Sequence, residues 1–146
     1  MEYKEPEEVA KISLRWVDEG YKAIKIHQGR SNAVESTKAV RDAVGDNIEI
    51  MLDVNGAWNP QEAAKNARKL ERYDLTWLEE PIWPVDDYDS LAHLRSETEI
   101  LIAGGENEFT HYGFRQLITK GAVDIVQPEV IMTGGIVACR KIFALA

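Results

Sequence analysis

Helix-like and strand-like segments alternate along almost the whole of this 146-residue chain. The strand-like segments are short apolar runs, and we expect strands at residues 22–27, 48–54, 75–78, 99–103 and 123–127. Strands that take turns with helices must pair in parallel and be joined by right-handed crossovers. The pattern therefore predicts an α/β fold.

Helices are expected between the strands because apolar residues recur there at helical spacing. The expected helices cover residues 5–19, 31–44, 60–73, 89–95 and 112–120, and a last helix follows Gly134 and Gly135. The start at Pro60 has the strongest signal. Asn59 can cap the helix, proline suits its first turn, and Glu62 can complete a capping box.

Polar residues at the ends of successive strands favour a barrel over an open sheet. They are separated by 23 to 27 residues, one βα unit each time: His27, Asp53, Glu79, Glu106 and Glu129. A (β/α)8 barrel carries its chemistry at the ends of many strands, whereas an open doubly wound sheet concentrates it at one switch point. A full barrel needs roughly 250 residues. We therefore expect a partial (β/α)8 TIM-type barrel of about five units, formed by residues 1–146 as one domain.

Composition narrows the classes of partner. Acidic residues outnumber basic ones by 25 to 17, and the net charge of -8 disfavours binding to nucleic acid or to an anionic membrane surface. The single cysteine, Cys139, excludes an internal disulfide and a Cys-rich zinc site. No apolar run approaches the roughly 20 residues of a membrane span. We expect a cytoplasmic protein that binds neither nucleic acid nor a membrane.

Three carboxylates are expected to converge at the ends of neighbouring strands. Side-chain alternation places Asp53 on the inner face of its strand, and Glu79 and Glu106 stand at the equivalent ends of the next two units. Adjacent strands lie about 4.8 Å apart, so three such charges repel one another unless a cation neutralises them. Hard oxygen ligands in an open site suit Mg²⁺, and Mn²⁺ next. A single acid at a strand end is more often a turn or cap residue, but three in consecutive units favour a metal site.

The first expected strand places Lys25 and His27 on its inner face, near the mouth of the barrel. Cationic groups are costly there unless they are paired or used in acid–base chemistry. An ion pair with a neighbouring carboxylate and a catalytic role are equally weighted alternatives for these two residues. Glu80, which follows Glu79 in the sequence, should point away from the cavity and form a salt bridge to a helix.

Five short motifs, in order and spacing, resemble the barrel of the enolase superfamily, in its mandelate racemase and muconate lactonizing enzyme subgroup. They are Lys25-Ile26-His27, Asp53-Val54-Asn55, Trp77-Leu78-Glu79-Glu80-Pro81, Ile102-Ala103-Gly104-Gly105-Glu106-Asn107, and Asp124-Ile125-Val126-Gln127-Pro128-Glu129 with Gly134-Gly135-Ile136. The resemblance implies that Asp53, Glu79 and Glu106 bind Mg²⁺ and that Asn55 lies near the substrate.

The resemblance also implies acid–base roles. Lys25 takes the first position of the family's Lys-x-Lys motif, and His27 stands where the second lysine is the usual base. Glu129 takes the place of an aspartate that orients a histidine from the following strand in some members. The chemistry implied is removal of a proton α to a carboxylate, with an enediolate stabilised by the metal. An acid-sugar dehydratase (a lyase) or a racemase or epimerase (an isomerase) is the expected enzyme, with a small carboxylate such as an acid sugar as substrate.

The chain is then expected to be a fragment of the C-terminal barrel domain, without the family's capping domain and terminal strands. The alternative is a non-catalytic metal-binding fragment that assembles but does not turn over. A partial barrel has open edge strands, and residues such as Met51, Trp77 and Ile102 are expected to face inward and meet water. We therefore expect a homodimer or higher oligomer.

Overall fold

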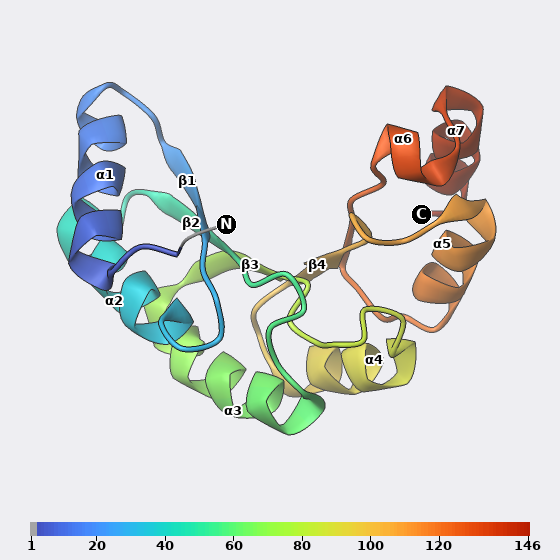
Figure 1. Cartoon of the computed structure of the whole chain (residues 1–146), viewed down its shortest axis with the longest axis horizontal. Helices are drawn as coiled ribbons and strands as arrows, with labels where there is room; N and C mark the ends of the chain where they lie inside the picture. Colours follow the sequence, from blue (N-terminus) through green and yellow to red (C-terminus); the bar gives the residue numbers. More distant parts are fainter. Residues whose placement is uncertain (1–2) are drawn as a thin grey trace.

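The computed structural model describes residues 3–146, and five parallel strands form its single sheet in the order β1-β2-β3-β4-β5. Helices cover the outer side of this sheet (Figure 1). The strands are β1 (Ala23–His27), β2 (Glu49–Asp53), β3 (Leu75–Glu79), β4 (Ile102–Gly104) and β5 (Ile125–Val126). The helices are α1 (Pro6–Asp18), α2 (Ala33–Val44), α3 (Pro60–Leu70), a 3-10 turn η1 (Glu71–Tyr73), α4 (Tyr88–Glu97), α5 (Thr110–Thr119), α6 (Val130–Thr133) and α7 (Ile136–Leu145).

This architecture confirms the predicted α/β fold with its five βα units. The largest differences are in the second half of the chain. β4 and β5 are shorter than expected, and the four-residue helix α6 was not predicted. Helix α6 forms because the Glu129 carboxylate accepts hydrogen bonds from the backbone N–H groups of Ile131 and Met132, which are its otherwise unpaired first-turn donors.

Helix α3 begins where the sequence signal places it. The Asn59 side chain accepts a hydrogen bond from the Glu62 N–H, and the Glu62 carboxylate accepts one from the Asn59 N–H, which completes the capping box. The buried residues Ala63, Ala67 and Leu70 recur at helical spacing and pack toward the sheet. The helix that follows the β2 loop is therefore fixed at its start and along its inner face.

The core lies between the sheet and the helices. Alternate strand residues supply it, including Ile24, Ile26, Ile50, Leu52, Leu78 and Ile102, all of them buried. Burying a large aliphatic side chain stabilises a fold by about 1.5–3 kcal/mol. On the other face, Met51 and Trp77 are partly exposed, as expected for residues that point inward.

The expectation that Ile102 faces inward is wrong. Ile102 pairs in register with Leu78, and Ala103 pairs with the inward-facing Glu79. Ile102 is fully buried among the core residues. Ile102 and Glu106 do not share a face, although they are four residues apart, because Gly105, at φ 124°, interrupts the extended backbone between them.

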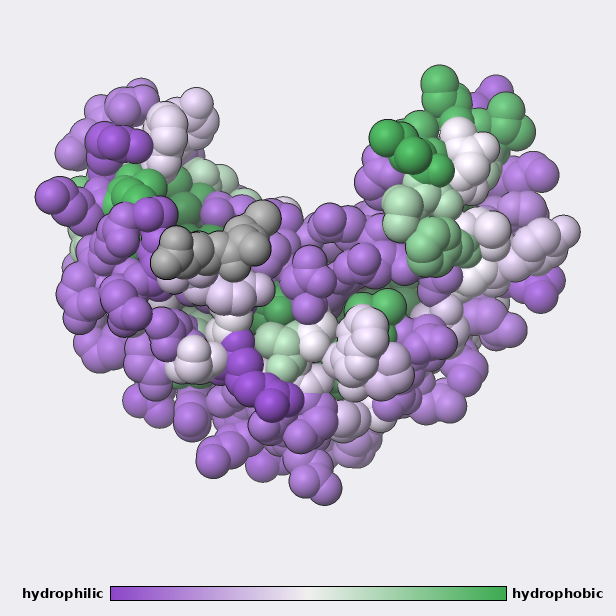
Figure 2. Space-filling view, viewed as in Figure 1, coloured by the Kyte–Doolittle hydropathy of each residue, from purple (hydrophilic) through white to green (hydrophobic). Residues whose placement is uncertain are grey.

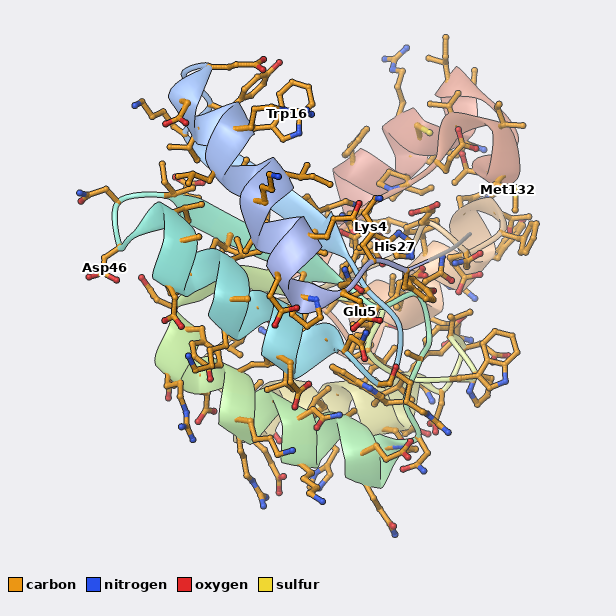
Figure 3. The ribbon with its side chains drawn as sticks, turned by 60° about the vertical axis from the view of Figure 1, so that its left-hand side comes forward. Lys4, Glu5, Trp16, His27, Asp46 and Met132 are labelled. Carbon is orange, nitrogen blue, oxygen red and sulfur yellow. The ribbon has the colours of Figure 1, made fainter. Side chains whose placement is uncertain are left out.

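The sheet curves, so that the molecule has two arms with a hollow between them (Figures 1 and 2). One arm carries α1 and β1, and the other carries α5, α6 and α7. Because all strands are parallel, their carboxyl ends lie at one edge of the sheet. Figure 3 shows His27 near Lys4 at this edge, far from Asp46, which precedes β2. None of the helices in residues 3–146 has the length and apolar composition that a bilayer crossing needs.

Candidate metal and acid–base site

Three strand ends bring polar side chains side by side. His27 pairs in register with Asp53, and Asp53 with Glu79, so the last residues of β1, β2 and β3 form a row. Glu106 lies two residues beyond the end of β4 and reaches the same place. Carboxylate oxygens of Asp53, Glu79 and Glu106 all lie within 4.8 Å of one another, with the first two residues buried and Glu106 exposed. The structure thus brings the three predicted acids together.

Lys25 supplies a positive charge to this cluster. Its Nζ donates hydrogen bonds to Glu79 Oε1 at 2.8 Å and to Asp53 Oδ2 at 3.3 Å. Burial alone would lower the pKa of Lys25, but the two carboxylates outweigh it and raise that pKa above its usual 10.5. The ion pair that the sequence left open as one alternative for Lys25 is therefore present.

Glu79 is held by several donors, although it is almost fully buried. Burial by itself would raise the pKa of Glu79, but the Gln127 amide, the Lys25 ammonium and the Trp77 indole together bring it below its ordinary 4.5. The indole N–H donates to Glu79 Oε2 at 3.0 Å. Trp77 faces inward as the sequence predicted, since it stands two residues before Glu79 on the same strand face.

His27 and Asn55 both adjoin Asp53. The Nδ1 atom of His27 lies 3.5 Å from Asp53 Oδ2. The other oxygen, Asp53 Oδ1, accepts a hydrogen bond from the Asn55 N–H at 3.0 Å. Asn55 adopts a left-handed backbone conformation (φ 44°) and is exposed. Asp53 thus links the carboxylate cluster to both residues.

Glu129 stands apart from these side chains. In residues 3–146, the group of carboxylates with ligand atoms close to one another consists of Asp53, Glu79 and Glu106. Glu129 instead caps α6, and both of its backbone hydrogen bonds, at 2.8 Å, use Oε2. Its role in this structure is that of a helix cap.

Glu80 does not form the salt bridge to a helix that was expected. It points away from the cluster as predicted, but its carboxylate accepts two hydrogen bonds from Asn107, in the loop after β4. Burial raises the pKa of Glu80, and the charges of Glu106 and Asp53 add to this, although the bonds from Asn107 oppose it. Sequence reasoning missed this contact because it joins residues 27 positions apart across two strand ends.

The donor set fits a hard divalent cation. Three carboxylates offer oxygen ligands, and the exposed side of the cluster at Glu106 leaves room for water or substrate. The Lys25 ammonium already shows that positive charge is stabilised between Asp53 and Glu79. Such a set suits Mg²⁺ and has no soft ligand that would favour other metals.

Comparison with known proteins decides the family. The sequence model of the family described as "Enolase C-terminal domain-like" matches residues 8–146. This chain belongs to that family. The membership confirms the resemblance that the five motifs carried, and the partial barrel of this chain is part of the enolase C-terminal domain-like fold.

The similar proteins are enzymes of one superfamily. Arabinonate dehydratase from Saccharolobus solfataricus is 36% identical over 148 residues, covering 99% of this chain and 39% of its own length. The crystal structure of 3,6-anhydro-D-galactonate cycloisomerase from Zobellia galactanivorans superposes with a TM-score of 0.90 at 38% identity, covering 97% of this chain and 40% of its own. A mutant L-talarate/galactarate dehydratase, liganded with Mg and L-glucarate, has a TM-score of 0.91 at 33% identity, covering 98% and 37%. This enolase-like chain therefore spans about two fifths of the length of these relatives.

Proposed function

We propose that this chain forms the metal-binding and acid–base part of an enzyme that removes a proton from the carbon α to a carboxylate. The observation that carries the proposal is the convergence of Asp53, Glu79 and Glu106 beside Lys25 and His27. The family supports the reaction class, because its matched members are dehydratases, cycloisomerases and racemases.

Asp53, Glu79 and Glu106 would hold Mg²⁺, with Mn²⁺ as the next choice. When bound, the divalent cation would offset the negative charge that develops on the substrate carboxylate. The similar dehydratase structure that is liganded with Mg supports this choice of metal.

His27 is the proposed base. Its Nδ1 faces Asp53, which favours the tautomer with the proton on Nδ1 and leaves Nε2 free to accept one. The C–H bond of the substrate breaks, the proton moves to His27 Nε2, and the electron pair is delocalised into the carboxylate as an enediolate. Racemisation then needs an acid on the opposite face to give the carbon a proton, whereas dehydration needs the β-hydroxyl group to take up a proton and leave as water while the electron pair forms the C=C bond. Lys25, held by two carboxylates, keeps a positive charge beside this reaction.

Two further residues have proposed roles. Asn55 is exposed next to Asp53, where its amide can hydrogen-bond a hydroxyl group of the substrate. Glu129 would orient a histidine of the following strand, as an aspartate does in some members of the family, and its Oε1 atom is not used by the α6 cap. The proposed substrate is an acid sugar, because similar proteins include an arabinonate dehydratase and a dehydratase liganded with L-glucarate.

Proton exchange tests this function. The chain, a panel of aldonic and aldaric acids and Mg²⁺ would be incubated in D₂O, and loss of the α-proton signal would be followed by NMR. We expect exchange with the wild type, none with His27→Asn, and wild-type exchange with His93→Asn, a control on the exposed face of α4. Exchange that persists in His27→Asn would move the role of base to Lys25 or another group.

A second candidate function is metal binding without turnover. It is favoured by the coverage, since the relatives are about two and a half times as long as the part that this chain matches. Saturable Mg²⁺ binding with no proton exchange on any acid of the panel would select this alternative.

We also propose that the chain self-associates. Within residues 3–146, β1 and β5 each pair on one side only. The arm that carries α5, α6 and α7 exposes a group of apolar side chains on α6 and α7, which Figure 2 shows in green: Ile131, Ile136, Val137 and Phe143. Open edges and apolar patches favour association with a second copy. Light scattering at micromolar concentration should give at least twice 16.5 kDa, and a stable monomer would contradict the proposal.

A further inference from the structure

Glu106 differs from the other two acids of the cluster because no strand holds it. β4 ends at Gly104, and the chain then turns through Gly105 at φ 124°. Only glycine fits there, since a Cβ atom would lie 2.7 Å from the ring of Phe114. Strand register therefore cannot place the Glu106 carboxylate beside Glu79, and other contacts must fix the loop that carries it.

The carboxylate of Glu80 holds Asn107, the residue after Glu106, by two hydrogen bonds. Glu80 Oε1 accepts a hydrogen bond from the backbone N–H of Asn107 at 3.1 Å, and Glu80 Oε2 accepts one from Asn107 Nδ2 at 2.6 Å. Glu80 is only 6% exposed. A buried carboxylate that bonds both the backbone and the side chain of one residue restrains that residue's position and orientation.

Glu80 itself has a fixed backbone. It adopts a left-handed conformation (φ 42°), which non-glycine residues rarely take. Its N–H donates to the Ala103 carbonyl at 2.9 Å, and its own carbonyl accepts from the Gly56 N–H at 2.7 Å. This turn sends the adjacent side chains in different directions, with Glu79 in the cluster and Glu80 in the pocket behind β4, next to Ala103 and Gly104.

We propose that Glu80 is a positioning residue for the metal centre, which acts by holding Asn107 and thereby keeping Glu106 within coordinating reach of Asp53 and Glu79. The inference rests on the proposed metal function of that cluster. It explains how an exposed loop residue joins two buried strand-end acids in one site.

The test measures Mn²⁺ affinity by electron paramagnetic resonance of the free ion. Glu80→Gln keeps the size of the side chain but cannot accept both bonds from Asn107, so Mn²⁺ should bind about 10- to 100-fold more weakly than to the wild type. The matched control is Asp124→Asn, because Asp124 holds the backbone N–H of Ile102 at the opposite end of β4. That control should change the affinity less than twofold.

A reciprocal variant separates positioning from charge. In Glu80→Gln/Asn107→Asp the total charge equals that of the wild type, and the glutamine can donate to the new carboxylate, so affinity should recover. Asn107→Asp alone should bind more weakly despite its extra negative charge, because it faces Glu80. Wild-type affinity in Glu80→Gln, or equal losses in Glu80→Gln and Asp124→Asn, would overturn the proposal.

Amide exchange in the metal-free protein distinguishes failure of this inference from failure of the metal site. The backbone N–H of Asn107 should exchange faster in Glu80→Gln than in the wild type. Its exchange rate should be the same in Asp124→Asn as in the wild type. Unchanged exchange at Asn107 in Glu80→Gln would overturn the positioning role alone. A wild type that binds Mn²⁺ no better than Glu79→Gln would overturn the metal site and, with it, the purpose assigned to Glu80.

Discussion

The first three strands and the last two place their polar residues by different means. β1, β2 and β3 each have five residues, and their register puts His27, Asp53 and Glu79 in one row. β4 and β5 have three and two residues, and Glu106 and Glu129 lie beyond their ends. In the first region the strand backbone fixes the positions of these residues, whereas in the second region side-chain hydrogen bonds do so.

The difference has a physical basis. A pair of strands fixes side-chain direction with a period of two residues, so a residue at a strand end has little freedom. A loop residue has no such ladder, and its position depends on contacts such as Glu80 with Asn107 or Glu129 with the N-terminus of α6. Changes in the first region should therefore affect the whole fold more than changes in the second.

The largest difference is expected from core truncation. Leu78→Ala in β3 removes a fully buried side chain and should lower the free energy of unfolding by about 3 kcal/mol. Val126→Ala in β5 removes a partly buried one and should lower it by about 1 kcal/mol. Urea denaturation followed by circular dichroism measures both. Equal losses would show that the two regions contribute alike to stability.

A smaller effect is expected from the ion pair in the first region. Lys25→Met should lower the free energy of unfolding by about 1 kcal/mol at pH 7, a modest value because the Lys25 side chain is 40% exposed. The folded-state pKa of Glu79 is lowered, so this contribution is present above pH 4.5 and is lost as the pH falls through that lowered pKa. The folded-state pKa of Lys25 is raised, so the contribution is also lost as the pH rises through it, above 10.5.

Denaturation of wild type and Lys25→Met across this pH range checks the prediction. The matched variant Lys38→Met removes a lysine from an exposed pair with Asp42 and should cost less at every pH. A stability difference between wild type and Lys25→Met that shrinks neither toward acid nor toward alkaline pH would contradict the assigned pairing.

Effects of about 1 kcal/mol or less are expected from the two helix caps. Glu129→Ala removes the cap of the short α6 and should cost about 0.5 kcal/mol, and Asn59→Ala removes the capping box of α3 and should cost about 1 kcal/mol. Neither should change Mg²⁺ affinity, which calorimetry measures. A loss of Mg²⁺ binding in Glu129→Ala as large as that in Glu79→Gln would place Glu129 in the metal site.

The same contrast explains what the sequence could predict. Strand alternation correctly put Asp53 and Glu79 on the inner face, because β2 and β3 stay in register from the Met51–Trp77 pair to their last residues, beyond the register shift at Ile50. It failed for Ile102, because Gly105 breaks the alternation before Glu106. The hydrogen bonds between Glu80 and Asn107 could not be predicted from a local sequence pattern, since they join two loops that only the folded sheet brings together.

Helix caps show the same limit. The Asn59 cap was predicted because proline and Glu62 accompany it in the sequence. The Glu129 cap was not predicted, because a four-residue helix is too short to show apolar periodicity in the sequence. Local sequence signals were thus sufficient to predict long, regular elements and insufficient to predict a short element such as α6.

The central claim is that a strand-held pair of acids and a loop-held acid form one divalent cation site. Crystals of the chain grown with Mn²⁺ and measured at the manganese absorption edge test it directly. The account predicts one anomalous peak, coordinated by an oxygen from each of Asp53, Glu79 and Glu106. A peak bound by Asp53 and Glu79 with Glu106 turned away, or no peak and the Lys25 ammonium still between those two acids, would contradict it.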